Sequence, residues 1–182
     1  FLDIGGWIGT TCLYGARKSK HVYVVEADRE SFHDLIINCK NNTSNTTCIE
    51  KAIFNQSGNE LLFGRNKFFP NAKLNESTSQ LYSDFSAAPE GSYSVTTITV
   101  EDILVNYSID PSTVSLIKVD IEGGEEAILQ DLYVVHSKYS IPLYVSFHYI
   151  WWSDKNLDRF PFLTDHQKQL IRTYPFISLL FV

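Results

Sequence analysis

Short apolar runs alternate along this chain with longer stretches in which apolar and polar residues are mixed. A short apolar run bounded by turn residues predicts a buried strand, and apolar residues that recur every three or four positions predict a helix. The clearest helical stretch follows Asp28, which can cap it, and carries Phe32, Leu35, Ile36 and Cys39 at i, i+3, i+4 and i+7. The predicted strands cover residues 1–4, 21–26, 47–54, 60–63, 93–98, 114–120, 143–148 and 176–182.

Further helices are predicted between these strands. They cover residues 8–17, 100–105 and 154–160, a stretch through Ala127, Ile128 and Leu132, and a last helix capped by Thr164 or Asp165 that ends near Tyr174. Strands that alternate with helices indicate an α/β fold with a mostly parallel sheet and helices on both faces. The chain has 182 residues, 44% of them hydrophobic, with no linker and no internal repeat, so we expect one domain over residues 1–182.

Residues 64–92 follow neither pattern and are rich in Asn, Ser, Pro and aromatic residues. A segment of this length without periodicity is usually functional or mobile. In an enzyme we expect it to form a lid or part of the acceptor pocket.

The first residues predict a strand, a glycine turn and the start of a helix, an arrangement that presents backbone N–H groups to a ligand. Dinucleotide sites require Gly-x-Gly-x-x-Gly, but Ile4 stands at the first of these positions, so that Gly6 and Gly9 alone fit. Asp3 directly before the turn suits a bound amine better than a pyrophosphate. This combination favours the aminoacyl moiety of S-adenosylmethionine.

A second acidic residue ends the next predicted strand. Glu26 follows the glycine turn at close to the spacing of about 20 residues at which an acid binds ribose hydroxyls in nucleotide sites. Either feature alone fits any α/β protein with a glycine turn and a charged strand end. The two together favour a nucleotide-type cofactor.

Two more strands are followed by polar residues, and ligands bind beyond the carboxyl ends of strands in open α/β sheets. Asp120 and Glu122 share a face if their strand continues. They can hold the sulfonium substrate, orient an acceptor hydroxyl or supply oxygen ligands to Mg²⁺. The alternative, a solvated acidic cap on the next helix, fits Glu125 and Glu126 best.

His148 ends a further strand and is the candidate general base, because its ordinary pKa of roughly 6.5 suits proton abstraction near neutrality. A lone histidine is more often structural. Trp151 and Trp152 are candidate platforms for a sugar ring, with burial under the final helix as the alternative. Asp120, Glu122 and His148 can also form a divalent metal site, although no spacing requires one.

Composition excludes several classes of partner. The net charge is −6 and Lys and Arg are scattered, which argues against nucleic acid, and no apolar run approaches the ~20 residues of a membrane span. Cys12, Cys39 and Cys48 lack metal spacing and predict buried free thiols in a reducing, cytoplasmic compartment. Several Asn-x-Ser/Thr triplets leave a secretory location as the less favoured alternative. Because the sequence contains no Met, we expect it to be a piece of a longer polypeptide.

Four segments together resemble the FkbM family of S-adenosylmethionine-dependent methyltransferases. They are residues 1–9, 25–28, 97–104 and 116–125. The last carries Lys118, Asp120, Glu122 and Gly123 in a lysine-x-aspartate-x-glutamate-glycine run that is close to specific for the family. The first two segments would fit many class I methyltransferases.

The resemblance implies a Rossmann-like sheet of seven strands with one antiparallel strand, matching residues 176–182. It implies O-methylation of a hydroxyl, often on a sugar or a glycosylated natural product. It also implies cofactor contacts by position. The methionine end would lie against Asp3, Gly5 and Thr10, the ribose against Glu26, the adenine against Ala27, Lys51 and Ala52, and the transferred methyl near Asp120, with Gly6 and Gly9 of the glycine turn as further cofactor contacts. The family motif does not identify the base, so His148 is inferred from position alone.

The sequence therefore predicts an S-adenosylmethionine-dependent O-methyltransferase that acts on a carbohydrate hydroxyl and is fused to, or acts with, glycosyltransferase domains. The alternatives are a methyltransferase for a non-carbohydrate small molecule and a catalytically inactive module that binds the cofactor. A nicotinamide-dependent oxidoreductase is disfavoured by Ile4.

Overall fold

The computed structural model describes residues 1–65, 79–82, 86, 88–174 and 176–182. Most of the unpatterned segment 64–92, with its predicted lid or acceptor pocket, lies outside these residues. The described chain has an α/β fold with two sheets and five α-helices, which confirms the predicted fold class.

The main sheet contains six strands in the described part of the chain, in the order β10-β9-β8-β1-β2-β3. The bounds are Leu2–Ile4 for β1, Val22–Glu26 for β2, Thr46–Glu50 for β3, Ile117–Val119 for β8, Leu143–Phe147 for β9 and Ile177–Phe181 for β10. All neighbours are parallel except β10, which runs antiparallel to β9. The antiparallel strand at the chain end is as predicted, but the sheet has six strands rather than seven.

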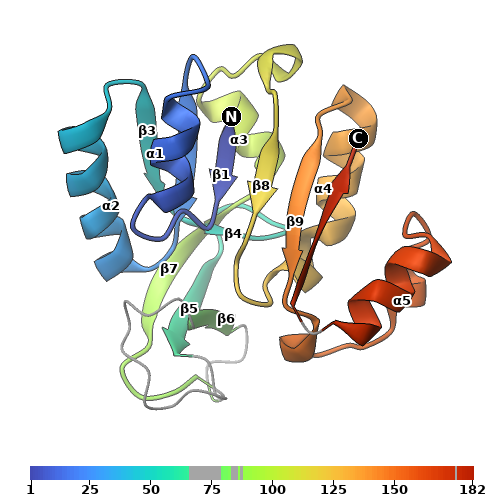
Figure 1. Cartoon of the computed structure of the whole chain (residues 1–182). Helices are drawn as coiled ribbons and strands as arrows, with labels where there is room; N and C mark the ends of the chain where they lie inside the picture. The colour runs from blue at the N-terminus through green and yellow to red at the C-terminus, as the bar shows by residue number, and fades with distance from the viewer. Residues whose placement is uncertain (66–78, 83–85, 87, 175) are drawn as a thin grey trace.

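The second sheet has the order β4-β7-β5-β6. Its strands are Ala52–Ile53 for β4, Glu60–Arg65 for β5, Ser79–Tyr82 for β6 and Tyr93–Ile98 for β7. The prediction of one strand over residues 47–54 was wrong, because Lys51 donates its backbone N–H to the Ile49 carbonyl (3.1 Å) and turns the chain out of the main sheet. Figure 1 shows the second sheet beyond the carboxyl ends of β1 and β8.

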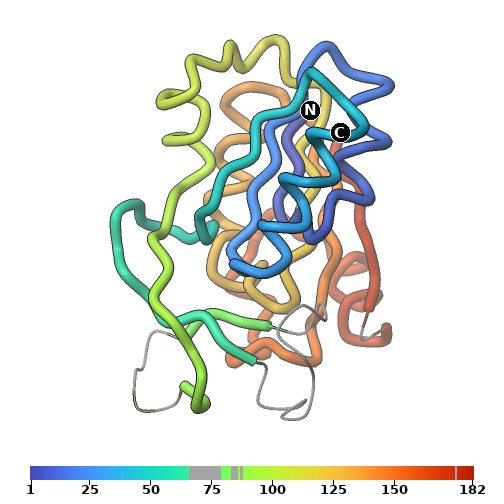
Figure 2. Tube along the Cα trace, turned by 90° about the vertical axis from the view of Figure 1, so that its left-hand side faces the viewer, coloured from blue at the N-terminus to red at the C-terminus, as the bar shows by residue number. Residues whose placement is uncertain are grey.

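Helices cover both faces of the main sheet, as Figures 1 and 2 show for α1 and α2 on one face and α3 and α4 on the other. Their bounds are Thr10–Ala16, Arg29–Asn42, Val100–Asn106 and Glu125–Tyr139, and α5 covers Asp165–Thr173. The core under α1 and α2 includes Cys12, Val24 and Leu35, and the opposite core includes Ile4 and Leu132. Apolar residues on both sides of the strands explain their nearly continuous apolar runs.

The predicted helix caps are confirmed for Asp28 and, of the two alternatives for the last helix, for Thr164, whose side chains accept backbone N–H groups at the starts of α2 and α5. Thr99 caps α3 in the same way. The helix predicted over residues 154–160 was wrong, since η4 spans just Leu157–Arg159. Asp154 and Asn156 each accept the N–H group two residues ahead (2.8 and 3.0 Å), and such local bonds compete with a helical ladder.

The composition led to expectations about the cysteines and about membrane-spanning segments. Cys12 and Cys39 are buried free thiols, as expected, whereas Cys48 is half-buried. Among the described helices, none is long and apolar enough to cross a membrane.

Candidate active site

A cavity lies at the carboxyl ends of the main sheet, where both sheets contribute to its wall. Eight residues predicted from the sequence line it: Gly5, Thr10, Glu26, Ala27, Lys51, Ala52, Asp120 and Glu122. The other predicted residues lie outside its lining: Asp3, Gly6, Gly9, His148, Trp151 and Trp152. Residues at the ends of β1, β2 and β8 therefore reach one cavity, as the sequence predicted for this edge of the sheet, whereas His148 after β9 lies outside the lining.

The glycine turn is packed tightly against the end of β8. Gly5 has a φ of 79°, and a Cβ added there would lie 1.8 Å from the carbonyl oxygen of Asp120. The N–H groups of Gly5 and Gly6 both donate to the Val25 carbonyl (3.0 and 3.1 Å). These N–H groups are therefore used within the fold, and the glycines serve to bring backbone close to backbone.

Asp3 is fully buried on the main sheet and lies beneath the cavity rather than in its wall. Its Oδ1 lies 3.1 Å from Nζ of Lys118, which also donates to the Gly5 carbonyl (2.9 Å). Burial raises the pKa of Asp3, and the neighbouring Lys118 ammonium opposes this shift. Asp3 thus supports the glycine turn through Lys118, a residue to which the sequence assigned no role although it interrupts an apolar strand.

Glu26 holds the turn from the neighbouring strand. One carboxylate oxygen accepts the backbone N–H of Trp7 (2.7 Å) and the other accepts that of Asp28 (2.7 Å). Burial raises the pKa of Glu26 to about 7, against the opposing effect of these backbone donors. Each oxygen keeps a further lone pair that a ligand hydroxyl can use.

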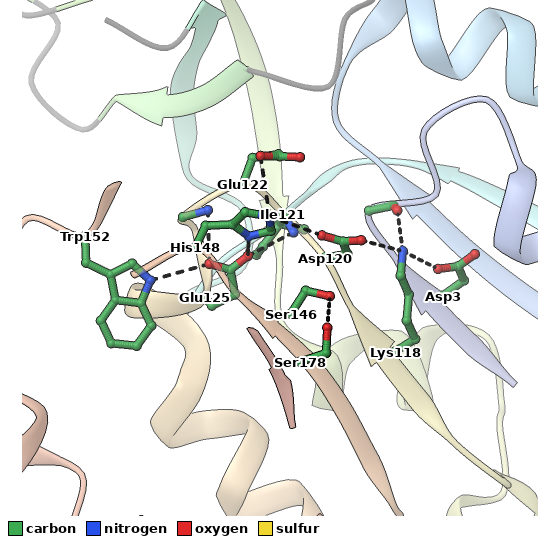
Figure 3. A network of polar contacts seen from close by, with 12 residues as sticks. Asp3, Lys118, Asp120, Ile121, Glu122, Glu125, Ser146, His148, Trp152 and Ser178 are labelled. Atoms are coloured by element: carbon green, nitrogen blue, oxygen red, sulfur yellow. Dashed lines mark hydrogen bonds and ion pairs between the residues drawn. The ribbon is translucent and has the colours of Figure 1, made fainter. Parts of the chain in front are cut away.

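Asp120 and Glu122 converge on His148, as Figure 3 shows. Nε2 of His148 lies 3.6 Å from Oδ1 of Asp120 and 3.6 Å from Oε2 of Glu122. The strand does not continue through these residues, since β8 ends at Val119 and Glu122 has a φ of 54°. A turn rather than a shared strand face brings the two acids together. Burial raises the pKa of Glu122 to about 7, and the charge of His148 opposes this effect.

Glu125 is fully buried, so the expected solvated cap was wrong for this residue. Its Oε1 accepts the N–H of Ile121 (3.0 Å) and lies 3.0 Å from Nδ1 of His148, while Oε2 accepts the N–H of Gly123 (3.0 Å). Glu126 is also mostly covered, because its carboxylate accepts the backbone N–H groups of Ser153 and Asp154 (2.6 and 2.8 Å). An acid in the first turn of a helix, directly after two glycines, was the available signal for Glu125.

His148 follows β9 and is 8% exposed. Its burial lowers the pKa, but the hydrogen bond to Glu125 and the charges of Glu125, Glu122 and Asp120 outweigh this effect and raise it. Trp151 stacks on the imidazole, with ring centroids 5.2 Å apart and an interplanar angle of 4°.

Trp152 belongs to the core rather than to an open platform. It is 3% exposed, packs against Phe147 and Phe160, and directs its indole N–H toward Glu125 (3.5 Å). Phe176, which the sequence did not single out, is 58% exposed and packs edge-on against Trp151. Trp151 and Phe176 thus form the aromatic surface beside His148, and burial explains Trp152.

A comparison with protein-family models identifies the family of this chain. The family model described as the methyltransferase FkbM domain matches residues 3–172. Among solved structures, the methyltransferase FkbM from Methylobacillus flagellatus KT matches with 21% sequence identity and a TM-score of 0.46, over 80% of this chain and 32% of that chain. The chain therefore spans about a third of the length of that protein. No curated protein matches the chain.

Proposed function

This chain belongs to the FkbM methyltransferase family, and from that premise we propose that it transfers the methyl group of S-adenosylmethionine to a hydroxyl of a sugar or glycan. The transfer forms a carbon–oxygen bond on the acceptor as the carbon–sulfur bond of the sulfonium breaks. The hydroxyl gives up its proton, and S-adenosylhomocysteine leaves. The activated methyl comes with the cofactor, so the protein has to align the two reactants and take up that proton.

The cavity residues fit this cofactor. Glu26 offers carboxylate lone pairs to ribose hydroxyls, and Lys51 with Ala52 would flank the adenine. At the methionine end, Asp120 lines the cavity, whereas Asp3 does not and is paired with Lys118. In this proposal Asp120 takes over the contact with the amine or sulfonium that the sequence suggested for Asp3.

One observation carries the proposal for the acceptor side: the buried pair of Glu125 and His148 lies directly behind Asp120 and Glu122, two residues that line the cavity. When Nδ1–H of His148 donates to Glu125 (3.0 Å), Nε2 is left with the lone pair that can accept a hydroxyl proton. Asp120 and Glu122, on the cavity side of that atom, would orient the hydroxyl. The half-buried ring of Trp151 and the exposed ring of Phe176 would lie against the flat face of a sugar.

The test is a methyl-transfer assay with labelled S-adenosylmethionine on an array of glycans and on non-carbohydrate hydroxyl compounds. We expect transfer to glycans, the products of glycosyltransferases, and at least a tenfold slower rate for His148→Gln with unchanged S-adenosylhomocysteine affinity. Glu101→Gln on the surface of α3 is the matched control and should transfer normally. Transfer to non-carbohydrates alone, or cofactor binding without transfer to any acceptor, would contradict the proposal.

A further inference from the structure

We propose that Asp120, Glu122 and Nε2 of His148 together bind one divalent cation. One ligand atom from each side chain lies within 4.8 Å of the others. Ligand atoms at bond lengths of about 2.0–2.2 Å can lie up to roughly 4.2 Å apart across a metal ion. Small side-chain rotations therefore bring all three atoms to bonding distance. Figure 3 shows the three side chains pointing toward one another from the turn after β8 and the end of β9.

The orientation of His148 is the observation that points to a cation. Glu125 is itself fixed by the N–H groups of Ile121 and Gly123, and it holds Nδ1 of His148. A buried carboxylate on one ring nitrogen and a metal on the other is the usual arrangement of metal-binding histidines. In the neutral ring, Nε2 directs its lone pair at two carboxylates, and within the described residues no hydrogen-bond donor is recorded at that atom. A positive charge between the three groups removes this repulsion.

The charged side chains around the site also favour a cation, because acidic groups outnumber basic ones. Asp3, Asp120, Glu122 and Glu125 contribute four carboxylates to one connected network, whereas Lys118 contributes the ammonium group that lies 3.1 Å from Asp3 and 3.8 Å from Asp120. Asp3 and Glu125 are fully buried and Glu122 is largely covered, whereas the Asp120 side chain is 40% exposed, and buried carboxylates require compensating charge. A divalent cation supplies more of it than the single proton of an imidazolium.

The donor set selects the class of cation. One imidazole nitrogen with two carboxylate oxygens suits a transition ion such as Mn²⁺ or Zn²⁺, whereas Ca²⁺ takes six to eight oxygen ligands. Asp120 and Glu122 line the cavity, so the remaining coordination positions face it. If the proposed function holds, the acceptor hydroxyl is the group that reaches these positions.

The experiment measures Mn²⁺ binding to the chelator-treated full chain, without cofactor, by electron paramagnetic resonance and calorimetry. We expect one Mn²⁺ per chain, and affinity at least tenfold lower for Asp120→Asn and for Glu122→Gln. Glu101→Gln should bind as the unchanged protein does. Spin-echo spectra should show a coordinated imidazole nitrogen that disappears in His148→Ala, and melting temperatures identify any variant that fails to fold. No binding, or binding that all the variants retain, would overturn the proposal.

Two further measurements separate the cation site from the proposed function. A cation on Nε2 of His148 occupies the lone pair that would take up the acceptor proton, so saturating Mn²⁺ should slow methyl transfer if His148 is the base. A rate that is unchanged by saturating Mn²⁺, together with a coordinated imidazole nitrogen in the spin-echo spectrum, would leave the cation site standing and remove His148 as the base, whereas an unchanged rate without that nitrogen signal would overturn the cation site. Mn²⁺ binding in a protein that methylates no acceptor would leave the cation site standing and remove the proposed function.

Discussion

The ion pair beneath the glycine turn allows a quantitative prediction. Lys118→Met removes the ammonium group that lies 3.1 Å from Asp3 and donates to the Gly5 carbonyl, while it keeps most of the side-chain volume. Asp3 is fully buried, so its carboxylate would remain in the core without a counter-charge. Breaking a buried pair in this way costs about 3–5 kcal/mol, because one charge stays uncompensated.

The pH dependence follows from the carboxyl group itself. Burial already raises the pKa of Asp3, and loss of Lys118 raises it further, so that the folded variant favours the protonated carboxyl more strongly than the unchanged protein does. The unfolded chain releases it at about pH 3.9, and each pH unit above that value costs the folded state about 1.4 kcal/mol. A carboxyl that stayed protonated in the folded variant at every pH would cost about 4 kcal/mol at pH 7 and about 1.5 kcal/mol at pH 5, and these figures are the upper limit. Stability is lost as the pH rises, and it returns on acidification.

Urea unfolding followed by circular dichroism at pH 7 and pH 5 measures this difference. The matched control is the double variant Asp3→Asn with Lys118→Met, which has no carboxyl to desolvate and should lose little stability between the two pH values. A loss below about 1 kcal/mol at pH 7, or a loss that is equal at pH 5, would refute the reasoning.

Three further predictions concern the cavity. Burial raises the pKa of Glu26 to about 7, so calorimetry should show S-adenosylhomocysteine affinity falling as the pH drops through 7, whereas Glu26→Gln should bind weakly and without this dependence; equal pH profiles would contradict a ribose contact. Gly5→Ala should cost at least about 3 kcal/mol, since the new Cβ would lie 1.8 Å from a backbone oxygen. Gly58→Ala has the same φ of 79° but open space, and should cost roughly 1–2 kcal/mol in thermal unfolding; equal losses would show that φ alone matters. Glu125→Gln should slow methyl transfer about tenfold or more and lower the pKa of His148, as NMR titration would show. An unchanged His148 pKa in this variant would show that Glu125 does not act on the imidazole.

The central strands of the main sheet, β1, β2 and β8, were predictable because they are buried on both faces. Their apolar runs need no knowledge of the partner strand, as the neighbouring Val24 and Val25 of β2 illustrate by packing into opposite cores. β9 instead alternates, with Leu143, Val145 and Phe147 buried and Tyr144 exposed. The errors arose where local hydrogen bonds decide the path. The turn at Lys51 divides one apolar run between two sheets. In the polar stretch after Trp152, the Asp154 side chain accepts the backbone N–H of Asn156, and such local bonds take the place of the backbone hydrogen bonds of a helix.

The candidate site was predictable as far as strand ends define it. Glu26 and Asp120 reach one cavity because parallel strands end at the same edge. Asp3 was placed in the ligand site because the sequence does not reveal which residue stands beside it, and the pairing of β1 with β8 puts Lys118 there. Glu125 was missed because an acid at a helix start is normally solvated, and its burial depends on tertiary contacts with His148.

The shortness of β1 and β8 has a consequence for how this fold can diversify. Each strand has three residues, and the Asp120 N–H donates to the Ile4 carbonyl (3.0 Å) where the two strands end. The segment that would carry the methyl donor and the segment that would receive the acceptor are thereby built as one rigid block. A slip of one residue between them would displace one reactant by about 3.3 Å, which abolishes in-line transfer. Changes of acceptor preference therefore belong to the outlying parts, the second sheet and the rings of Trp151 and Phe176, where sequence can vary without disturbing the alignment of the reactants.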